Sequence, residues 1–220
     1  MKIIVTGSKG FIGSKLKKRL EELGHQVFDH AYTKVEGIGL VYHLAAKTDV
    51  QASFKDPIDD ARANILLTLE VLKNYPDVRI IYPASACEIE EKSPYGISKR
   101  AAAKYVEALA KDYVILLLSN VWGEGGHGVI NIFQNSEICT IYGTGEQTRT
   151  ITHVDDIVEA FIHAMNVPKG KYSVGGEVVT VNEIVRRIGK PFVHKEAKEG
   201  EIYASVIPNT LPGFEPKIKL

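Results

Sequence analysis

A tyrosine and a lysine four residues apart, Tyr95 and Lys99, have the types and spacing that best suit catalysis in this chain. At the start of a predicted helix this spacing puts both side chains on one face. A free tyrosine has a pKa of about 10, so a nearby ammonium stabilises the phenolate that a general base needs. Tyr95 is predicted to exchange a proton with a substrate oxygen, and Ser85 to donate a hydrogen bond to that oxygen. Taken singly, Lys99 also suits an exposed helix and Ser85 a turn cap.

Three glycines at positions 7, 10 and 13 lie where a predicted strand, residues 2–6, gives way to a helix. The first glycine permits a tight turn, the second lets the backbone approach a pyrophosphate, and the third lets helix and strand pack closely. Free N–H groups and the positive end of the helix then face the anion. This turn is therefore predicted to bind a dinucleotide. A glycine-rich turn without a ligand is the alternative.

An acidic residue after the second strand typically holds the adenosine ribose, and Asp29 is the nearby candidate. This favours NAD as the cofactor, with NADP left open. A solvated turn aspartate is the competing interpretation of Asp29.

The elements that must position these residues alternate between strand and helix. Because parallel neighbours need long crossovers, the alternation predicts a mostly parallel sheet with helices on both faces. Only about ten residues separate the second and third strands, too few for a crossover helix and another strand. After Trp122 a glycine cluster begins a region with shorter elements. The predicted strands are 2–6, 26–28, 39–44, 78–82 and 113–118, and the predicted helices are 14–23, 60–75, 95–111, 155–165 and 181–188.

The composition is that of an ordinary globular protein, with 45% hydrophobic and 25% charged residues. Lys plus Arg equals Asp plus Glu at 27 each, which offers no bulk electrostatic case for a nucleic-acid or membrane partner. The longest apolar run, near residues 113–118, is too short to span a bilayer. Two cysteines, Cys87 and Cys139, lie far apart without a metal-ligand spacing, and we expect a cytoplasmic protein without a metal site.

Several segments together resemble one family, the extended short-chain dehydrogenase/reductases that act as NAD-dependent nucleotide-sugar epimerases and dehydratases. Residues 6–13, Thr-Gly-Ser-Lys-Gly-Phe-Ile-Gly, are similar to its dinucleotide turn, and residues 41–46, Val-Tyr-His-Leu-Ala-Ala, to its next marker along the cofactor. Residues 118–123 resemble its Asn-Val-Tyr-Gly segment, and residues 141–156 the segment whose arginine grips a nucleotide diphosphate. Further matches at the usual offsets are Val50, Ser53, Pro57 and Asn64.

The resemblance implies an α/β fold: a Rossmann-type doubly wound parallel sheet with a small C-terminal substrate-binding lobe. The implied domains are residues 1–122, with the helix at 155–165 packing back on them, and residues 123–220. The implied cofactor contacts are Gly7, Gly10, Phe11, Ile12, Gly13, Asp29, Leu44, Ala45, Ala46, Asn64, Tyr95 and Lys99. The implied substrate contacts are Ser85, Asn120, Arg149 and Lys198, the last in place of a late arginine. A surface ion pair with Asp155 or Glu146 is the alternative for Arg149.

Several departures from the family pattern restrict which of the family's reactions is expected. Family 4,6-dehydratases carry an Asp-Glu pair just after the catalytic Ser or Thr, and Ala86-Cys87 stands there, which disfavours dehydration. Slipping the alignment by one residue would put Ala86 at the serine position and Glu88 at an acidic one. The segment before His43 is short, which removes part of the usual adenine pocket.

The leading hypothesis is an NAD-dependent nucleotide-sugar 4-epimerase that works through a transient 4-keto sugar. A one-way reductase or dehydrogenase of a keto sugar or other small carbonyl is the second hypothesis, and a catalytically silent NAD-binding protein is the third. By analogy with the family, we expect a homodimer formed by the helices at 60–75 and 95–111, which would meet as four helices. Alanines 101, 102, 103 and 108 suit either this interface or packing on the sheet.

Overall fold

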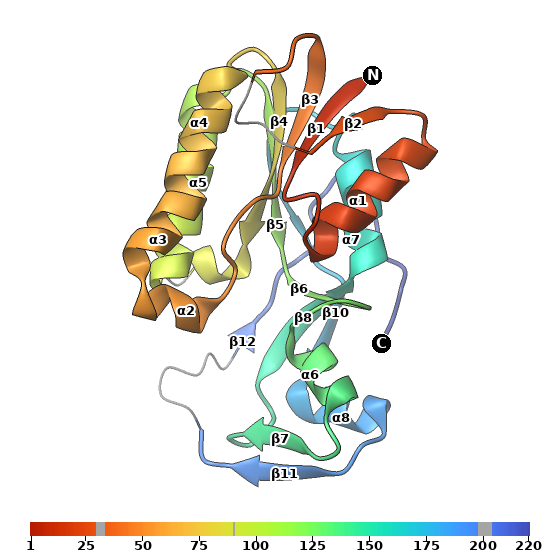
Figure 1. Cartoon of the computed structure of the whole chain (residues 1–220). Helices are drawn as coiled ribbons and strands as arrows, with labels where there is room; N and C mark the ends of the chain where they lie inside the picture. Colours follow the sequence, from red (N-terminus) through yellow and green to blue (C-terminus); the bar gives the residue numbers. More distant parts are fainter. Residues whose placement is uncertain (30–33, 90, 198–203) are drawn as a thin grey trace. The chain divides into compact units, whose positions relative to one another are not determined.

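The computed structural model describes residues 1–29, 34–89, 91–197 and 204–220 (Figure 1). The chain folds into two compact units. The first comprises residues 1–117 and 158–172, and the second comprises residues 118–157 and 173–220. Two segments of the sequence therefore build each unit.

A six-stranded parallel sheet forms the centre of the first unit, as predicted, with the strand order β2-β1-β3-β4-β5-β9. β1 lies between β2 and β3 and pairs with both in parallel. The chain thus leaves β1 toward one side and returns to its other side, which makes the carboxyl ends of β1 and β3 a topological switch point. The strands are β1 (Lys2–Thr6), β2 (Gln26–Phe28), β3 (Ile38–His43), β4 (Arg79–Ser85), β5 (Tyr113–Leu118) and β9 (Gly170–Val174).

Helices cover both faces of this sheet (Figure 1). α1 (Phe11–Glu22) and α7 (Val154–His163) lie on one face, where the Tyr42 hydroxyl donates to the Phe161 carbonyl oxygen. α3 (Pro57–Ala61), α4 (Leu67–Asn74) and α5 (Pro94–Leu109) lie on the other. Ala102 and Ala103 are buried there in the cluster formed with the sheet, so these two alanines pack on the strands.

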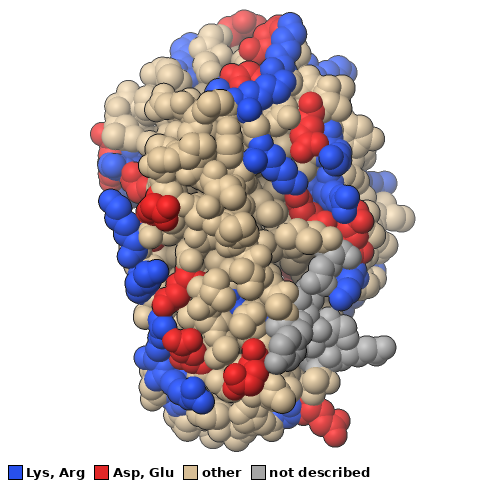
Figure 2. All heavy atoms as spheres, turned by 180° about the vertical axis from the view of Figure 1, so that it is seen from behind, with Lys and Arg blue, Asp and Glu red and all other residues tan. Residues whose placement is uncertain are grey.

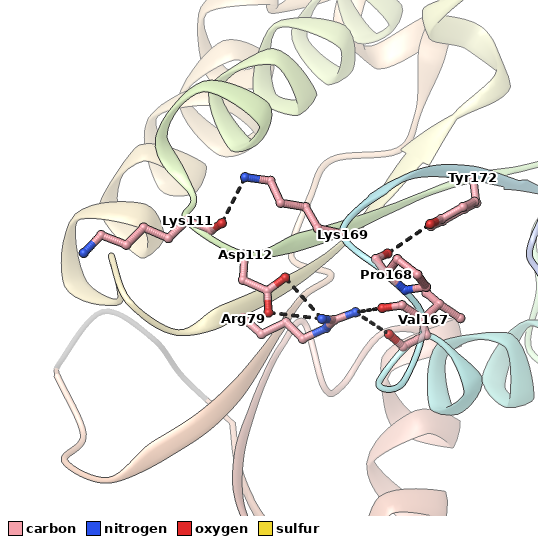
Figure 3. Close-up of polar contacts among 8 residues, drawn as sticks. Arg79, Lys111, Asp112, Val167, Pro168, Lys169 and Tyr172 are labelled. Atoms are coloured by element: carbon pink, nitrogen blue, oxygen red, sulfur yellow. Dashed lines mark hydrogen bonds and ion pairs between the residues drawn. The ribbon is translucent and has the colours of Figure 1, made fainter.

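Arg79 of β4 connects the sheet to the segment that follows α7 (Figure 3). One guanidinium nitrogen, Nη1, donates to both carboxylate oxygens of Asp112 at 3.1 Å. The other, Nη2, donates to the carbonyl oxygens of Ala164, at 3.2 Å, and Val167, just beyond the end of α7. A cation suits these carbonyls because they carry the negative end of the helix dipole. Residues 158–172 therefore belong to the first unit although 118–157 fold elsewhere.

The second unit contains smaller sheets. Its central strand, β8 (Thr148–His153), pairs antiparallel with β10 (Glu177–Thr180) and parallel with β6 (Asn120–Trp122) and β12 (Ala204–Ser205). A parallel pair is formed by β7 (Cys139–Tyr142) and β11 (Phe192–Lys195). α6 (Val129–Asn135) and α8 (Val181–Ile188) complete a core that includes Phe133, Ile151 and Ile184.

The helix predicted over residues 60–75 begins earlier and is interrupted. Asp56 caps α3, a π-helical turn, η1 (Arg62–Leu66), follows it, and α4 ends at Asn74. A short helix, α2 (Val50–Lys55), precedes them. Neither α2 nor α6 was predicted, because short helices carry too few turns for a clear apolar period. Between β2 and β3, the described residues contain no helix or strand, in agreement with the shortened crossover.

Charged side chains are interspersed with uncharged ones on the face shown in Figure 2. Blue Lys and Arg side chains neighbour red Asp and Glu side chains, which fits the equal numbers of the two signs. No helix among the described residues is long and apolar enough to cross a membrane.

Candidate active site

The glycine turn joins β1 to α1 in a conformation that requires its glycines. Gly7 has a φ of +70°, and a Cβ built on it would lie 2.8 Å from the Ala45 backbone nitrogen. A Cβ on Gly13 would lie 2.1 Å from the Gly7 carbonyl oxygen. Only a hydrogen fits at either position, so the first turn of α1 lies directly against the end of β1.

The amino end of α1 is left uncapped by side chains of the described residues. Gly10 is its N-cap and has no side chain to accept a hydrogen bond from the helix. Phe11 and Ile12, which follow, are half-buried. Backbone N–H groups at such an end, together with the helix dipole, favour an anion. This cradle, in which a Cβ would be excluded, fits the pyrophosphate of a dinucleotide.

The segment after β3 lies against the glycine turn. The Ala45 backbone N–H donates to Thr6 Oγ1 at 2.9 Å, and Leu44, Ala45 and Ala46 are all half-buried. These residues therefore border the switch point between β1 and β3, where α/β sheets bind ligands.

Asp29 follows β2 and is held by a lysine from α1. Lys17 Nζ donates to Asp29 Oδ1 at 2.8 Å. This hydrogen bond is the main reason why the pKa of Asp29 is lowered, and a hydrogen bond with Ser8 adds to it. The carboxylate is thus charged and lies beside the glycine turn, where a ribose hydroxyl would need an acceptor.

The start of α5 carries the predicted catalytic pair. Ser93 Oγ accepts from the Gly96 backbone N–H at 3.1 Å, and Pro94 occupies the first helical turn. The Tyr95 backbone N–H donates to Ser53 Oγ at 3.2 Å. A Cβ on Gly96 would meet the Cys87 carbonyl oxygen at 2.4 Å, so the turn after β4 packs tightly on this helix. The first turn of α5 is consequently held from two sides.

The structure brings Tyr95 and Ser85 within hydrogen-bond distance of each other. A hydrogen bond with Ser85 lowers the pKa of Tyr95, but burial outweighs it and raises that pKa to about 12. Bringing the value near 7 requires about 7 kcal/mol of preferential stabilisation of the phenolate. Ser85 Oγ also accepts from the Cys87 backbone N–H at 3.2 Å, so this serine is both a turn cap and a partner of the tyrosine.

Lys99 is buried, and its ammonium lies over an aromatic ring. Its Nζ is 4.1 Å from the centroid of the Tyr82 ring, an arrangement that favours a cation. Burial nevertheless lowers the pKa of Lys99 to about 7. The alternative of an exposed helix lysine is therefore excluded.

The buried His43 lies between the end of β1 and α4. His43 Nδ1 lies 2.8 Å from Thr6 Oγ1, and His43 Nε2 lies 2.9 Å from Thr68 Oγ1. Burial first, and then the charge of Lys99, lower the pKa of His43 to about 3, so the imidazole is neutral. His43 therefore connects the end of β1 to α4 without adding a charge.

Asn64 is buried, and its amide is engaged by the protein. Its Oδ1 accepts from the Lys47 backbone N–H at 2.8 Å, and its Nδ2 donates to Ser98 Oγ at 2.9 Å and Asp60 Oδ1 at 3.2 Å. Asn64 thus fixes the segment after β3 to α5. Its direct contact with a dinucleotide stays a prediction.

The predicted diphosphate contacts belong to the second unit. Asn120 begins β6, and its Nδ2 donates to the Thr150 carbonyl oxygen at 3.1 Å. Arg149 lies on the neighbouring strand β8 and donates from Nη1 to the Thr148 carbonyl oxygen at 2.8 Å. The structure thus places both residues in one sheet, whereas Lys198 lies outside the described residues.

A profile of the NAD dependent epimerase/dehydratase family matches residues 29–175, more than half of the chain. The chain belongs to this family. It is 27% identical, over an alignment 267 positions long, to a putative UDP-glucose 4-epimerase of Methanocaldococcus jannaschii, with 91% of this chain and 88% of that protein covered. A dTDP-D-glucose 4,6-dehydratase of Dictyostelium discoideum is 29% identical, with 73% and 54% covered.

A solved structure agrees with this assignment. The UDP-glucose 4-epimerase of Thermotoga maritima, crystallised with UDP-glucose, has a TM-score of 0.87 and 26% identity, with 100% of this chain and 94% of that chain covered. The extended short-chain dehydrogenase/reductase resemblance and its Rossmann-type fold are thereby confirmed. The family is NAD-dependent, and the uncapped glycine turn of this chain fits that cofactor.

Two buried acidic residues beside the family's tyrosine and lysine were not predicted as site residues. Asp60 and Glu88 are 1% and 3% exposed. Glu88 occupies an acidic position of the family pattern only if the alignment is shifted by one residue. The hydrogen bond between Ser85 and Tyr95 supports the unshifted alignment, in which Glu88 follows the serine by three residues. Sequence reasoning had no signal for their burial, because an acidic residue is ordinarily exposed.

Proposed function

We propose that this protein is an NAD-dependent nucleotide-sugar 4-epimerase. The observation that carries the proposal is the buried Tyr95, hydrogen-bonded to Ser85 and one helical turn before Lys99, in the same unit as an uncapped glycine turn. The similarity to UDP-glucose 4-epimerases over nearly the whole chain supports the sugar class.

The residues of this chain handle the proton of the reaction. Tyr95 accepts a proton on its phenol oxygen from the 4-hydroxyl of the sugar, while Ser85 donates a hydrogen bond to the same substrate oxygen. The Lys99 ammonium stabilises the phenolate that this step requires. After the keto sugar has turned and presents the opposite face of C4, Tyr95 returns the proton to the same sugar oxygen. Bound NAD supplies the acceptor and the donor of the hydride.

Asn120 and Arg149 are proposed to hold the diphosphate so that only the sugar turns. A guanidinium suits this task because its planar array of N–H groups binds two phosphate oxygens together. Their positions on adjacent strands of one sheet support a shared role. Lys198 keeps its predicted part in substrate binding.

Dehydration is disfavoured by the turn after Ser85. The dehydratase pattern needs an acidic pair there, and Ala86 and Cys87 supply no carboxyl group to protonate a leaving hydroxyl. A 4-epimerase needs no such acid, because the bond between the sugar carbon and its hydroxyl oxygen does not break.

The direct test is incubation of the purified protein with UDP-glucose, UDP-N-acetylglucosamine and dTDP-glucose, with products separated by chromatography. We expect conversion of at least one sugar to its 4-epimer without net production of NADH. Steady NADH formation or consumption at 340 nm would instead identify a dehydrogenase or reductase. Absence of turnover with all three sugars, together with oxidation of an unrelated alcohol, would refute the sugar assignment.

We further propose a homodimer through the helices α3 to α5. Large apolar side chains are exposed on these helices and on the neighbouring α2 and η1, and exposed apolar surface of this kind is typical of an interface. A hollow of about 390 Å³ lies among Pro57, Ile58, Ala61, Arg62, Ile65 and Leu66. The exposed apolar residues are Phe54, Ile58, Leu66, Ile97, Tyr105 and Leu109. Light scattering should give twice the chain mass for the native protein and the single mass for Leu66→Lys combined with Leu109→Lys.

A cytoplasmic location is proposed from the cysteines. Cys87 and Cys139 are both free, as thiols are in a reducing compartment. Cell fractionation with compartment markers tests this location.

A further inference from the structure

Three charged side chains are buried among the described residues of the first unit, and they lie around the proposed active site. They are the carboxylates of Asp60 and Glu88 and the ammonium of Lys99, each no more than 3% exposed. A buried charge is costly unless it has a partner. Lys99 therefore depends on nearby carboxylates to remain charged.

Asp60 already has other hydrogen-bond partners. Its carboxylate accepts from Ser98 Oγ at 2.5 Å and from Asn64 Nδ2 at 3.2 Å. These bonds connect Asp60 of α3 to Ser98 of α5 and to Asn64 of η1.

Glu88 is anchored on its other side by a lysine. It lies on a 3₁₀ turn, η2 (Ala86–Glu88), that directly follows Ser85. Its Oε1 is paired with Lys171 Nζ of β9, while its Oε2 is buried without a partner among the described residues. Lys171 is exposed to solvent, so it can balance the Glu88 charge without itself being enclosed.

The turn that carries Glu88 cannot move freely relative to α5. Ser85 caps it, and the Cys87 carbonyl lies where any side chain at Gly96 would stand. The charge of Glu88 is therefore held in a set position relative to Tyr95 and Lys99, which lie on the first turns of the same helix.

Titratable groups face Lys99 from each neighbouring element. They are His43 from β3, Tyr82 from β4, Asp60 from α3, Glu88 from η2 and Tyr95 one turn earlier on α5. His43 is neutral, and the two tyrosines are neutral unless Tyr95 ionises. The negative charges of Glu88, first, and Asp60, second, oppose the effect of burial on the pKa of Lys99.

We propose that Glu88, anchored by Lys171, is a positioning residue that keeps the Lys99 side chain charged beside Tyr95. Glu88 touches neither substrate nor cofactor in this role and acts through Lys99. The inference rests on the proposed roles of Tyr95 and Lys99 but not on the identity of the sugar.

The test measures the protonation of Lys99 in the protein alone. Lysine labelled with ¹³C at Cε is incorporated, and its NMR signals are followed with pH, with the Lys99 signal assigned by its loss in Lys99→Met. We expect Glu88→Gln to lower the titration midpoint of Lys99 by about one pH unit, the size of shift that a nearby charge produces. The control is Glu107→Gln. Glu107 lies on α5, as Lys99 does, but its carboxylate contacts Lys104, so its loss should leave the Lys99 midpoint unchanged.

The pH profile of turnover gives a second measurement. Activity should rise as Tyr95 loses its proton and fall as Lys99 loses its proton, with two apparent pKa values that belong to the pair. Loss of the Glu88 charge favours the phenolate and disfavours the ammonium, so both limbs should move to lower pH in Glu88→Gln. A merely structural role would lower the height of the profile and leave both limbs in place.

An unmoved Lys99 midpoint in folded Glu88→Gln overturns the inference, whatever the substrate proves to be. If that variant does not fold, Glu88→Gln combined with Lys171→Met removes both members of the ion pair, and the Lys99 midpoint of this double variant is read in the same way. Failure of the sugar assay with a shifted midpoint would instead refute only the proposed substrate.

Discussion

The two helix beginnings at the centre of the first unit, those of α1 and α5, are built in opposite ways. α1 begins at Gly10 without a side-chain cap, whereas α5 begins at Ser93, whose hydroxyl caps the helix at 3.1 Å. The uncapped N–H groups of α1 can bind an anionic ligand, whereas the Gly96 N–H at the start of α5 already donates to Ser93. The comparison teaches that α1 is adapted to bind through its backbone and α5 to position side chains.

The two beginnings also differ in what a Cβ would disturb. At α1 a Cβ on Gly13 would collide with the Gly7 carbonyl oxygen, within the glycine turn itself. At α5 a Cβ on Gly96 would collide with the Cys87 carbonyl oxygen, in the turn after β4. Close packing therefore shapes a ligand cradle in one case and joins two catalytic segments in the other.

The largest expected effect comes from removing the phenol oxygen at α5. Tyr95→Phe should lower turnover by about 10²- to 10⁴-fold, the usual contribution of a general base, while NAD affinity changes little. Steady-state kinetics and calorimetric titration with NAD check the two quantities. Retained turnover in Tyr95→Phe would favour the silent NAD-binding protein and remove the functional contrast between the helices.

A change at α1 should have the opposite pattern. Gly13→Ala places a Cβ against the Gly7 carbonyl, so the turn must open, and NAD affinity should fall by at least about tenfold, or 1.4 kcal/mol. Calorimetric titration measures this loss. The matched control is Gly24→Ala, because nothing lies within 4 Å of a Cβ there, although its φ of +80° costs some stability. Equal loss of affinity in both variants would contradict a specific role for the turn.

The buried charge at α5 should make stability depend on pH. Burial lowers the folded-state pKa of Lys99 to about 7, so between that pH and about 10 the unfolded chain binds more protons than the folded one. This residue should therefore make the free energy of unfolding rise with pH in that window, by up to about 1.4 kcal/mol per pH unit. Urea unfolding at several pH values should show a smaller slope for Lys99→Met, and an unchanged slope would show that Lys99 is not the group responsible.

The smallest expected effect concerns the cap itself. Ser93→Ala should lower the free energy of unfolding by about 1 kcal/mol, because the Gly96 N–H loses its acceptor. Ser93→Asp keeps an acceptor at the cap and should restore most of this stability. If Ser93→Ala leaves stability unchanged, the cap is not what distinguishes the start of α5.

Local sequence patterns predicted much of this difference between the start of α1 and the start of α5. The spacing of Gly7, Gly10 and Gly13, the Tyr95–Lys99 pair and the alternation of strands and helices predicted the turn, the shared helix face and the parallel sheet. Each of these follows from backbone geometry over a few residues, which is why a single segment carries the signal. The family resemblance then extended the prediction to a nucleotide-sugar substrate.

What only the tertiary structure decided is the surroundings of the catalytic pair. Several of its features depend on segments that are far apart in the chain. They are the burial of Asp60 and Glu88, the neutral state of His43 and the contact of Lys171 with Glu88. No local pattern marks such residues, because the cost and the effect of a charge depend on which distant groups exclude water from it. The sequence by itself therefore determined which residues could react, and the packing of distant segments decided the electrostatic conditions under which they do so.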